Sequence, residues 1–167
     1  MRRRPSAMVL FSAFVLLAVV VVAIIGNVFT PFAATDQDLL NRIKPPAFLG
    51  GPEQYPLGTD RIGRDMVARL VAGLRMSLAV ALAGTLIGAV FGTTIGFIAA
   101  HFRGWTEEVL MMAVDFQASL PFILIALTLL AFFGNSLVLF VILMGLFGWE
   151  TYARLARGVV LSAKSQP

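Results

Sequence analysis

Four long apolar runs alternate with polar segments along this chain, and they predict its helices. The first run, residues 7–25, is interrupted only by Ser12 and is long enough to cross a bilayer. An arginine triplet precedes it, so a secretory signal is the alternative interpretation. The apolar core is longer than that of a typical signal, and Pro31 and Phe32 stand where a small residue should precede cleavage. We therefore predict an uncleaved membrane anchor.

The second run, residues 76–100, contains no charged residue and carries a glycine every fourth position. On a helix these glycines form one stripe, at Gly84, Gly88, Gly92 and Gly96. Each glycine costs a helix about 1 kcal/mol against alanine, so the stripe needs an offsetting gain. In lipid, small residues let a neighbouring backbone approach closely. The stripe predicts a tightly packed partner helix, and the alternative is that glycine is simply common in membrane helices.

The third run, residues 109–133, contains an acidic residue and a proline. Asp115 is either a pore or relay carboxylate or a helix-end carboxylate bonded to a neighbour, and we favour the second interpretation because it lies only two turns in. Pro121 is predicted to bend the helix, because it lacks a backbone donor and crowds the preceding turn.

The fourth run follows a predicted tight turn at residues 134–136. Only residues 137–149 are free of charge, so a full span must continue past Glu150 toward Arg154. The spacing of these two residues allows an ion pair on one helix face. Trp149 and Tyr152 are then expected at a membrane interface. We place Tyr152, Arg154 and Arg157 at the cytoplasmic end of this helix.

A long polar segment, residues 30–75, separates the first two runs. Its first part is rich in proline and glycine, which predicts extended or turning backbone. From Asp60 onward apolar residues recur at helical spacing, which predicts an amphipathic helix on the membrane surface that feeds the second span, with Asp60 or Thr59 as its cap. The predicted fold is an all-α membrane protein with about four transmembrane helices and this outer-surface helix. We divide it into residues 1–73 and residues 74–167, the latter with helices 2–4.

Composition agrees with this fold and excludes several functions. Of the 167 residues 59% are apolar and 13% charged, and the mean hydropathy is +0.89, far from a soluble domain. There is no cysteine and a single histidine, His101, so no disulfide, thiolate or metal site is expected. We find no phosphate-binding loop, HExxH or GxSxG motif, and no basic stripe for nucleic acid, so we expect neither an enzyme nor a nucleic-acid partner.

Basic residues set the predicted orientation. They are almost evenly divided between the two sides, so the arginine triplet at residues 2–4 and the short later loops decide it. We predict a cytoplasmic amino terminus.

Three stretches of the sequence resemble one family. The first, YPLGTDRIGRDMVARLVAGLRMSL, resembles the "PLGTD…GRD" segment before the second span in permease subunits of bacterial dipeptide and oligopeptide ABC importers. The other two, GWTEEVLMMAVDFQASLPFILIAL and GWETYARLARGVVLS, are similar to that family's later spans. The first stretch matches at Pro56, Leu57, Gly58, Thr59, Asp60, Gly63, Arg64 and Asp65.

The resemblance implies a transport subunit of a bacterial inner membrane with no chemistry of its own. It implies a second permease subunit, two cytoplasmic ATPase subunits that use the ATP, and an extracytoplasmic solute-binding protein as partners, besides the lipid bilayer. No cofactor is expected on this chain. The solute, whether a peptide, a nickel complex or another small molecule, stays open.

Two departures from the family pattern affect this interpretation. Met112 stands where relatives usually carry arginine, so Asp115 is expected to pair elsewhere or be neutral. The chain ends where the family continues into an "EAA" coupling segment and two further spans, so we expect a fragment or truncated form. The alternatives are an uncoupled permease remnant or a small structural membrane protein that only packs with partner helices. A secondary transporter is a weaker option, because no inverted repeat is visible.

Overall fold

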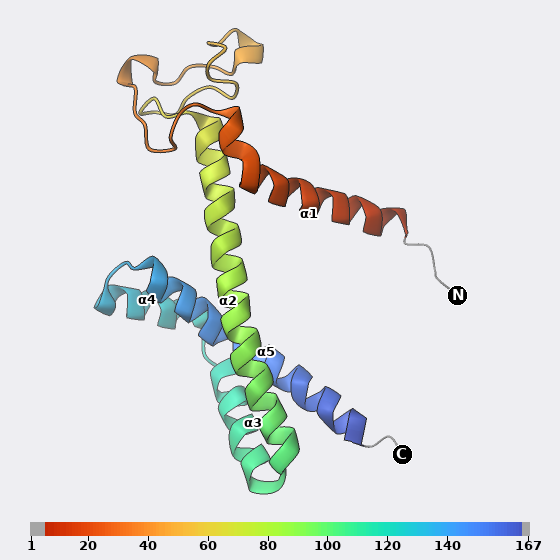
Figure 1. Ribbon diagram of the computed structural model, residues 1–167. Coiled ribbons are helices and arrows are strands. Elements are labelled where there is room, and N and C mark those ends of the chain that lie inside the picture. The colour runs from red at the N-terminus through yellow and green to blue at the C-terminus, as the bar shows by residue number, and fades with distance from the viewer. Residues whose placement is uncertain (1–5, 165–167) are drawn as a thin grey trace. The chain divides into compact units, whose positions relative to one another are not determined.

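The computed structural model describes residues 6–164, and helices dominate them (Figure 1). Three helices are long and apolar enough to cross a membrane: α1 (Ala7–Ile25), α2 (Met66–Phe102) and α5 (Leu137–Lys164). A bent pair, α3 (Gly104–Ala118) and α4 (Phe122–Phe133), adds a fourth span if it crosses as one unit. The prediction of an all-α membrane protein with about four spans is confirmed.

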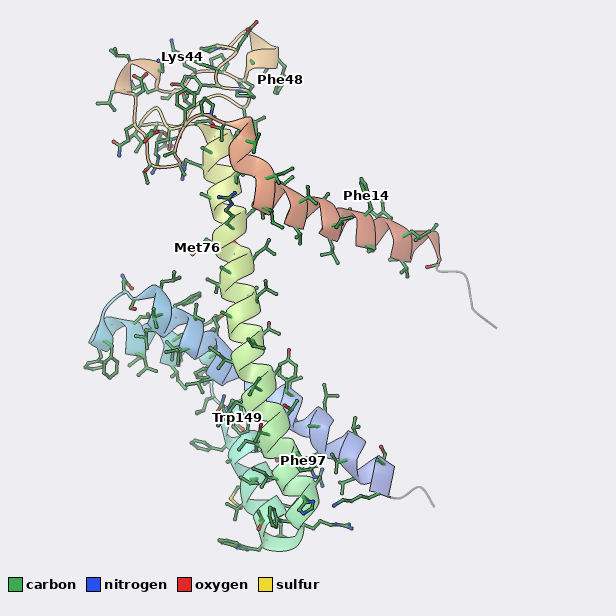
Figure 2. All side chains as sticks on the ribbon, viewed as in Figure 1. Phe14, Lys44, Phe48, Met76, Phe97 and Trp149 are labelled. Carbon is green, nitrogen blue, oxygen red and sulfur yellow. The ribbon has the colours of Figure 1, made fainter. Side chains whose placement is uncertain are left out.

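Helix α1 has the bounds predicted from the first apolar run. Ser6 caps it, since its Oγ accepts from the N–H of Val9 at 3.4 Å. Most of its side chains are exposed, Phe14 among them, which suits a helix surrounded by lipid (Figure 2). A 3₁₀ turn, η1 (Gly26–Phe29), follows directly. The arginine triplet lies outside the described residues.

Helix α2 corrects the prediction of a separate surface helix. It runs unbroken for 37 residues, so the amphipathic positions after Met66 are its first turns. Residues 60–64 are not helical, because the Asp60 carboxylate holds a turn and Gly63 adopts φ +78°. The cap is therefore Asp65 rather than Asp60 or Thr59: its Oδ1 accepts from Val67 N–H at 3.2 Å and its Oδ2 from Ala68 N–H at 3.1 Å.

The third apolar run is broken into two helices, which corrects the prediction that Pro121 only bends one helix. Helices α3 and α4 meet at 82°, with Pro121 at the start of α4. Figure 1 shows the change of direction between the two helices. Proline has no N–H and disfavours helical backbone in the preceding residue, so α3 cannot continue through it. Ser119 closes α3 instead: its N–H and its Oγ both donate to the carbonyl oxygen of Asp115.

The predicted turn at residues 134–136 is present, and α5 follows it. Gly134 has φ +85°, a conformation that favours glycine. Ser136 caps α5 by accepting from Leu139 N–H at 3.5 Å. Helix α5 then continues for 28 residues through Glu150 and Arg154, as the length argument required.

The chain forms two compact units that divide between Leu78 and Ala79, within the length of α2. In the first, the loop between α1 and α2 contains two short 3₁₀ helices, η2 (Leu39–Asn41) and η3 (Ala47–Leu49). The second unit has a small core of Val114, Trp149 and Ala153. The predicted division at residue 73 stays a prediction.

Candidate functional site

The motif segment, residues 56–65, is a tight loop with two positions at which only glycine fits. Gly58 and Gly63 have φ of +75° and +78°. A Cβ on Gly58 would lie 2.3 Å from the carbonyl oxygen of Lys44, and one on Gly63 would lie 1.8 Å from that of Asp38. Two segments of the loop therefore touch backbone to backbone at these glycines.

Asp60 holds this loop together through hydrogen bonds. Its Oδ1 accepts from the N–H groups of Ile62 and Arg64, both at 2.9 Å, and its Oδ2 from Arg64 Nε and Arg69 Nη1, both at 2.8 Å. Burial alone would raise the pKa of Asp60, but the hydrogen bonds from Arg64 and Ile62 outweigh it and lower the pKa to about 2. Asp60 is thus a charged anchor of the turn.

Thr59 and Asp65 tie the same loop to the start of α2. The two residues form an isolated antiparallel bridge. Thr59 Oγ1 accepts from Lys44 N–H at 2.9 Å and donates to the Asn41 carbonyl. Asp65 is 2% exposed, and its Oδ2 also accepts from the Thr30 hydroxyl at 2.7 Å.

The other motif positions have smaller roles in the structure. Pro56 accepts at its carbonyl oxygen from Ala47 N–H at 3.2 Å, while Leu57 is 43% exposed. The structure thus gives the motif a local architectural use.

Arg75 has a role that sequence reasoning missed, since it served there only as a boundary. Its guanidinium donates to the carbonyl oxygens of Ala23 and, at 2.8 Å, Ile24, which are the last turn of α1. A cation at a helix C-terminus complements the helix dipole and its free carbonyl groups. Near that contact, a Cβ on Gly26 would lie 2.6 Å from the Val71 side chain. A lone arginine at the edge of an apolar run is the signal in the sequence that could have revealed this role.

The glycine stripe of α2 lies against α5. A Cβ on Gly84 would be 3.1 Å from Met144 Cβ, and one on Gly88 would be 2.9 Å from the Gly145 carbonyl oxygen. At Gly92 and Gly96 it would be 2.2 Å from the carbonyl oxygens of Trp149 and Ala153. We call this contact the glycine seam. The two helices run in the same direction along it, since the contacts on α5 advance from Met144 to Ala153 as the glycines of α2 advance from Gly84 to Gly96.

Trp149 belongs to the interior of the protein, and its predicted place at a membrane interface stays a prediction. It is 7% exposed, its ring meets that of Phe91 edge-on at 5.2 Å, and it lies where α5 passes α2 (Figure 2). Its Nε1 donates to Gln117 Oε1 at 2.5 Å, and Gln117 in turn donates to the Leu146 carbonyl. A buried indole N–H needs a partner, which Gln117 of α3 supplies.

Asp115 is paired with Arg154 rather than isolated. Arg154 Nη1 lies 3.3 Å from Asp115 Oδ1, and the Asp115 side chain is 72% exposed. The predicted pair of Glu150 and Arg154 is therefore wrong, because α3 brings a second carboxylate within reach of the arginine. Glu150 Oε2 is buried with no hydrogen-bond partner among residues 6–164.

Two further contacts join the end of α5 to its neighbours. Arg157 Nε lies 2.6 Å from Glu107 Oε1 of α3, and Lys164 Nζ donates to the Ala100 carbonyl of α2 at 3.1 Å. Tyr152 lines an open apolar groove of about 540 Å³ with Thr93, Thr94 and Phe97 of α2. Within the described part of the chain, no three His, Cys, Asp or Glu residues gather as metal ligands.

Parallel spans packed on glycine, with a broken span between them, define the class: a multi-pass, all-α membrane protein. Residues 92–167 match the family model of the binding-protein-dependent transport system inner membrane component. With the relatives below, this match confirms the predicted resemblance to permease subunits of binding-protein-dependent ABC importers.

Three relatives show how far the similarity extends. A glutathione transport system permease protein of Pectobacterium atrosepticum is 32% identical over 96% of this chain. A dipeptide transport system permease protein of Haemophilus influenzae is 27% identical over 90% of it, and an oligopeptide transport system permease protein of Bacillus subtilis 28% over 99%. The matched regions are 52%, 52% and 53% of these relatives, so the chain spans about half their length.

Proposed function

We propose that this chain forms part of the transmembrane translocation pathway of an ABC importer for peptides or similar small solutes. The observation that carries the proposal is the similarity over 90–99% of the chain to permease proteins of dipeptide, oligopeptide and glutathione transport systems. The partners we propose are a second permease subunit, two cytoplasmic ATPase subunits and an extracytoplasmic solute-binding protein. ATP is used by the ATPase subunits, and this chain binds no cofactor.

Two features of the structure support a moving pathway rather than an inert anchor. The glycine seam gives α2 and α5 a close backbone contact, which suits a rigid element of a rocking bundle. The broken α3–α4 pair suits a transporter as well, because interrupted helices at membrane depth occur where protein or a cavity surrounds them. The loop between α1 and α2 is our proposed rim for the docked binding protein.

ATP-driven uptake tests this function. Membrane vesicles from the source cells are loaded with ATP and given the binding protein and a labelled dipeptide, with and without the gene for this chain. We expect uptake only with the gene, and we expect the purified complex to contain a second permease and two ATPase subunits. Uptake that is unchanged by loss of the gene contradicts the proposal.

The orientation we propose places the amino terminus in the cytoplasm of a bacterial cell. The cysteine-free sequence allows a direct test with Ser6→Cys and Glu53→Cys, which flank α1. A membrane-impermeant maleimide should label Glu53→Cys in intact spheroplasts and Ser6→Cys only after permeabilisation. The reverse pattern contradicts this orientation.

A further inference from the structure

A cavity of about 210 Å³ lies in the loop between α1 and α2. It is lined by Phe32, Asp36, Gln37, Asp38, Tyr55, Gly63 and Asp65. Asp36 and Gln37 are exposed and form its rim, while Tyr55 and Asp65 are buried and form its floor. The cavity therefore opens to the surroundings and closes on a polar floor.

The charge in this cavity is uncompensated. Three of its lining residues are aspartates, and none has an ion-pair partner among residues 6–164, where Arg64 and Arg69 pair with Asp60, outside the cavity. Neutral donors serve them instead: Ala33 N–H for Asp36, Leu40 N–H and Asn41 Nδ2 for Asp38. Each carboxylate keeps free lone pairs, and Asp65, the buried one, has hydrogen-bond donors but no cation among residues 6–164.

A second observation, independent of the carboxylates, points to a ligand. Tyr55 is only 3% exposed and lines the cavity, and its hydroxyl, which no hydrogen bond among residues 6–164 engages, still reaches solvent. Buried tyrosine hydroxyl groups usually find a partner. Burial, with the nearby charges of Asp38 and Asp65, raises the pKa of Tyr55, so the hydroxyl stays protonated.

An aromatic wall completes the cavity. The rings of Phe32 and Tyr55 stack with centroids 5.0 Å apart. Aromatic faces beside carboxylates are the chemistry that recognises organic cations. A bare metal ion fits poorly, because within residues 6–164 no three carboxylates or imidazoles converge as ligands.

We propose that this cavity binds an organic cation, the primary ammonium group of a partner molecule. A volume of about 210 Å³ holds roughly seven waters, enough for an ammonium group and a short alkyl stem but less than a typical ligand pocket. Only the charged end of a longer molecule enters. That end is either the amino group of a free small solute or a lysine side chain of a docked protein. This inference goes beyond the proposed transport function and does not depend on it, because binding to the cavity needs only this chain.

Calorimetry on the full chain in the uncharged detergent dodecyl maltoside tests the site. The probe is n-butylammonium, with neutral n-butanol as the matched control. We expect saturable binding of the ammonium and none of the alcohol. Asp38→Asn should weaken binding about tenfold and Tyr55→Phe about fivefold. Glu53→Gln removes an exposed carboxylate of the same loop and should leave affinity unchanged.

Tyr55→Phe keeps the stack on Phe32 and removes only the hydroxyl, so it remains informative if Asp38→Asn does not fold. The dipeptide Ala-Ala and its N-acetylated form then separate the two sources. Binding of free Ala-Ala supports a solute amino group, and binding of n-butylammonium alone supports a lysine side chain. Failure of n-butylammonium to bind, or binding equal in wild type and Tyr55→Phe, overturns the proposal. Because calorimetry requires no transport, a failure of the dipeptide uptake experiment would not change the binding result.

Discussion

The loop between α1 and α2 and the glycine seam hold themselves together by opposite means. In the loop, charged and hydroxyl side chains satisfy the backbone, as Asp60 does with two N–H groups and two arginines. In the seam, side chains are missing, and the backbones of α2 and α5 meet at Gly92 and Gly96. The loop must hold its shape in water, where polar groups compete for solvent, whereas helices in lipid gain from close packing.

The largest expected effect comes from filling the seam. Gly92→Ala places a Cβ 2.2 Å from the Trp149 carbonyl oxygen, which is backbone and cannot yield easily. We expect a loss of about 1–3 kcal/mol, the range for overpacked cores. Resistance to sodium dodecyl sulfate, followed by tryptophan fluorescence, measures it.

The matched control is Gly148→Ala on α5, where a Cβ meets nothing within 4 Å. That change should be neutral or stabilising by up to about 1 kcal/mol, because alanine favours helix. Gly84→Ala, with 3.1 Å to Met144 Cβ, should fall between the two. Equal stability of all three variants would show that the seam is not tightly packed in the membrane.

A pH titration probes the loop but not the seam. The pKa of Asp60 is about 2 in the folded loop against an ordinary 3.8, so its contribution is complete above pH 3.8 and is lost as the pH falls toward 2. We expect the amide protons of Ile62 and Arg64 to lose protection against exchange over that window, when the rate is compared with the intrinsic rate at each pH. Asp60→Asn should abolish the pH dependence at these two amides, while amides of α5 near Trp149 stay unchanged. A transition of equal size in the Asn variant would assign it to another carboxylate.

The smallest effect is expected at a polar contact between helices. The Asp115 side chain is 72% exposed, so Asp115→Asn should change stability by less than about 1 kcal/mol. The comparison is Glu107→Gln, whose side chain is 17% exposed and lies 2.6 Å from Arg157, and which should cost about 1.5 kcal/mol or more. Denaturant unfolding of both variants measures the difference. A larger loss at Asp115 would indicate that its pair with Arg154 is shielded from water.

Periodicity and length in the sequence were sufficient to predict most helices. The first run gave the bounds of α1, and the charge-free length after residue 137 required a helix through Glu150. The glycine interval predicted close packing, because small residues in lipid have no other gain to offset their cost. These features depend on local spacing and on the thickness of the bilayer, which the sequence carries by itself.

Tertiary structure decided which groups pair and where helices begin. The partner of Arg154 is Asp115 of α3 rather than Glu150, since ion pairs depend on distance in space and not along the chain. Asp65 caps α2 because Asp60 is already engaged by Arg64 and Arg69, and Trp149 is buried because Gln117 of α3 meets its N–H. Asp38, Tyr55 and Asp65 are separated along the chain, and only the fold brings them into one cavity. Such contacts arise from segments that are distant in the chain, which no local pattern records.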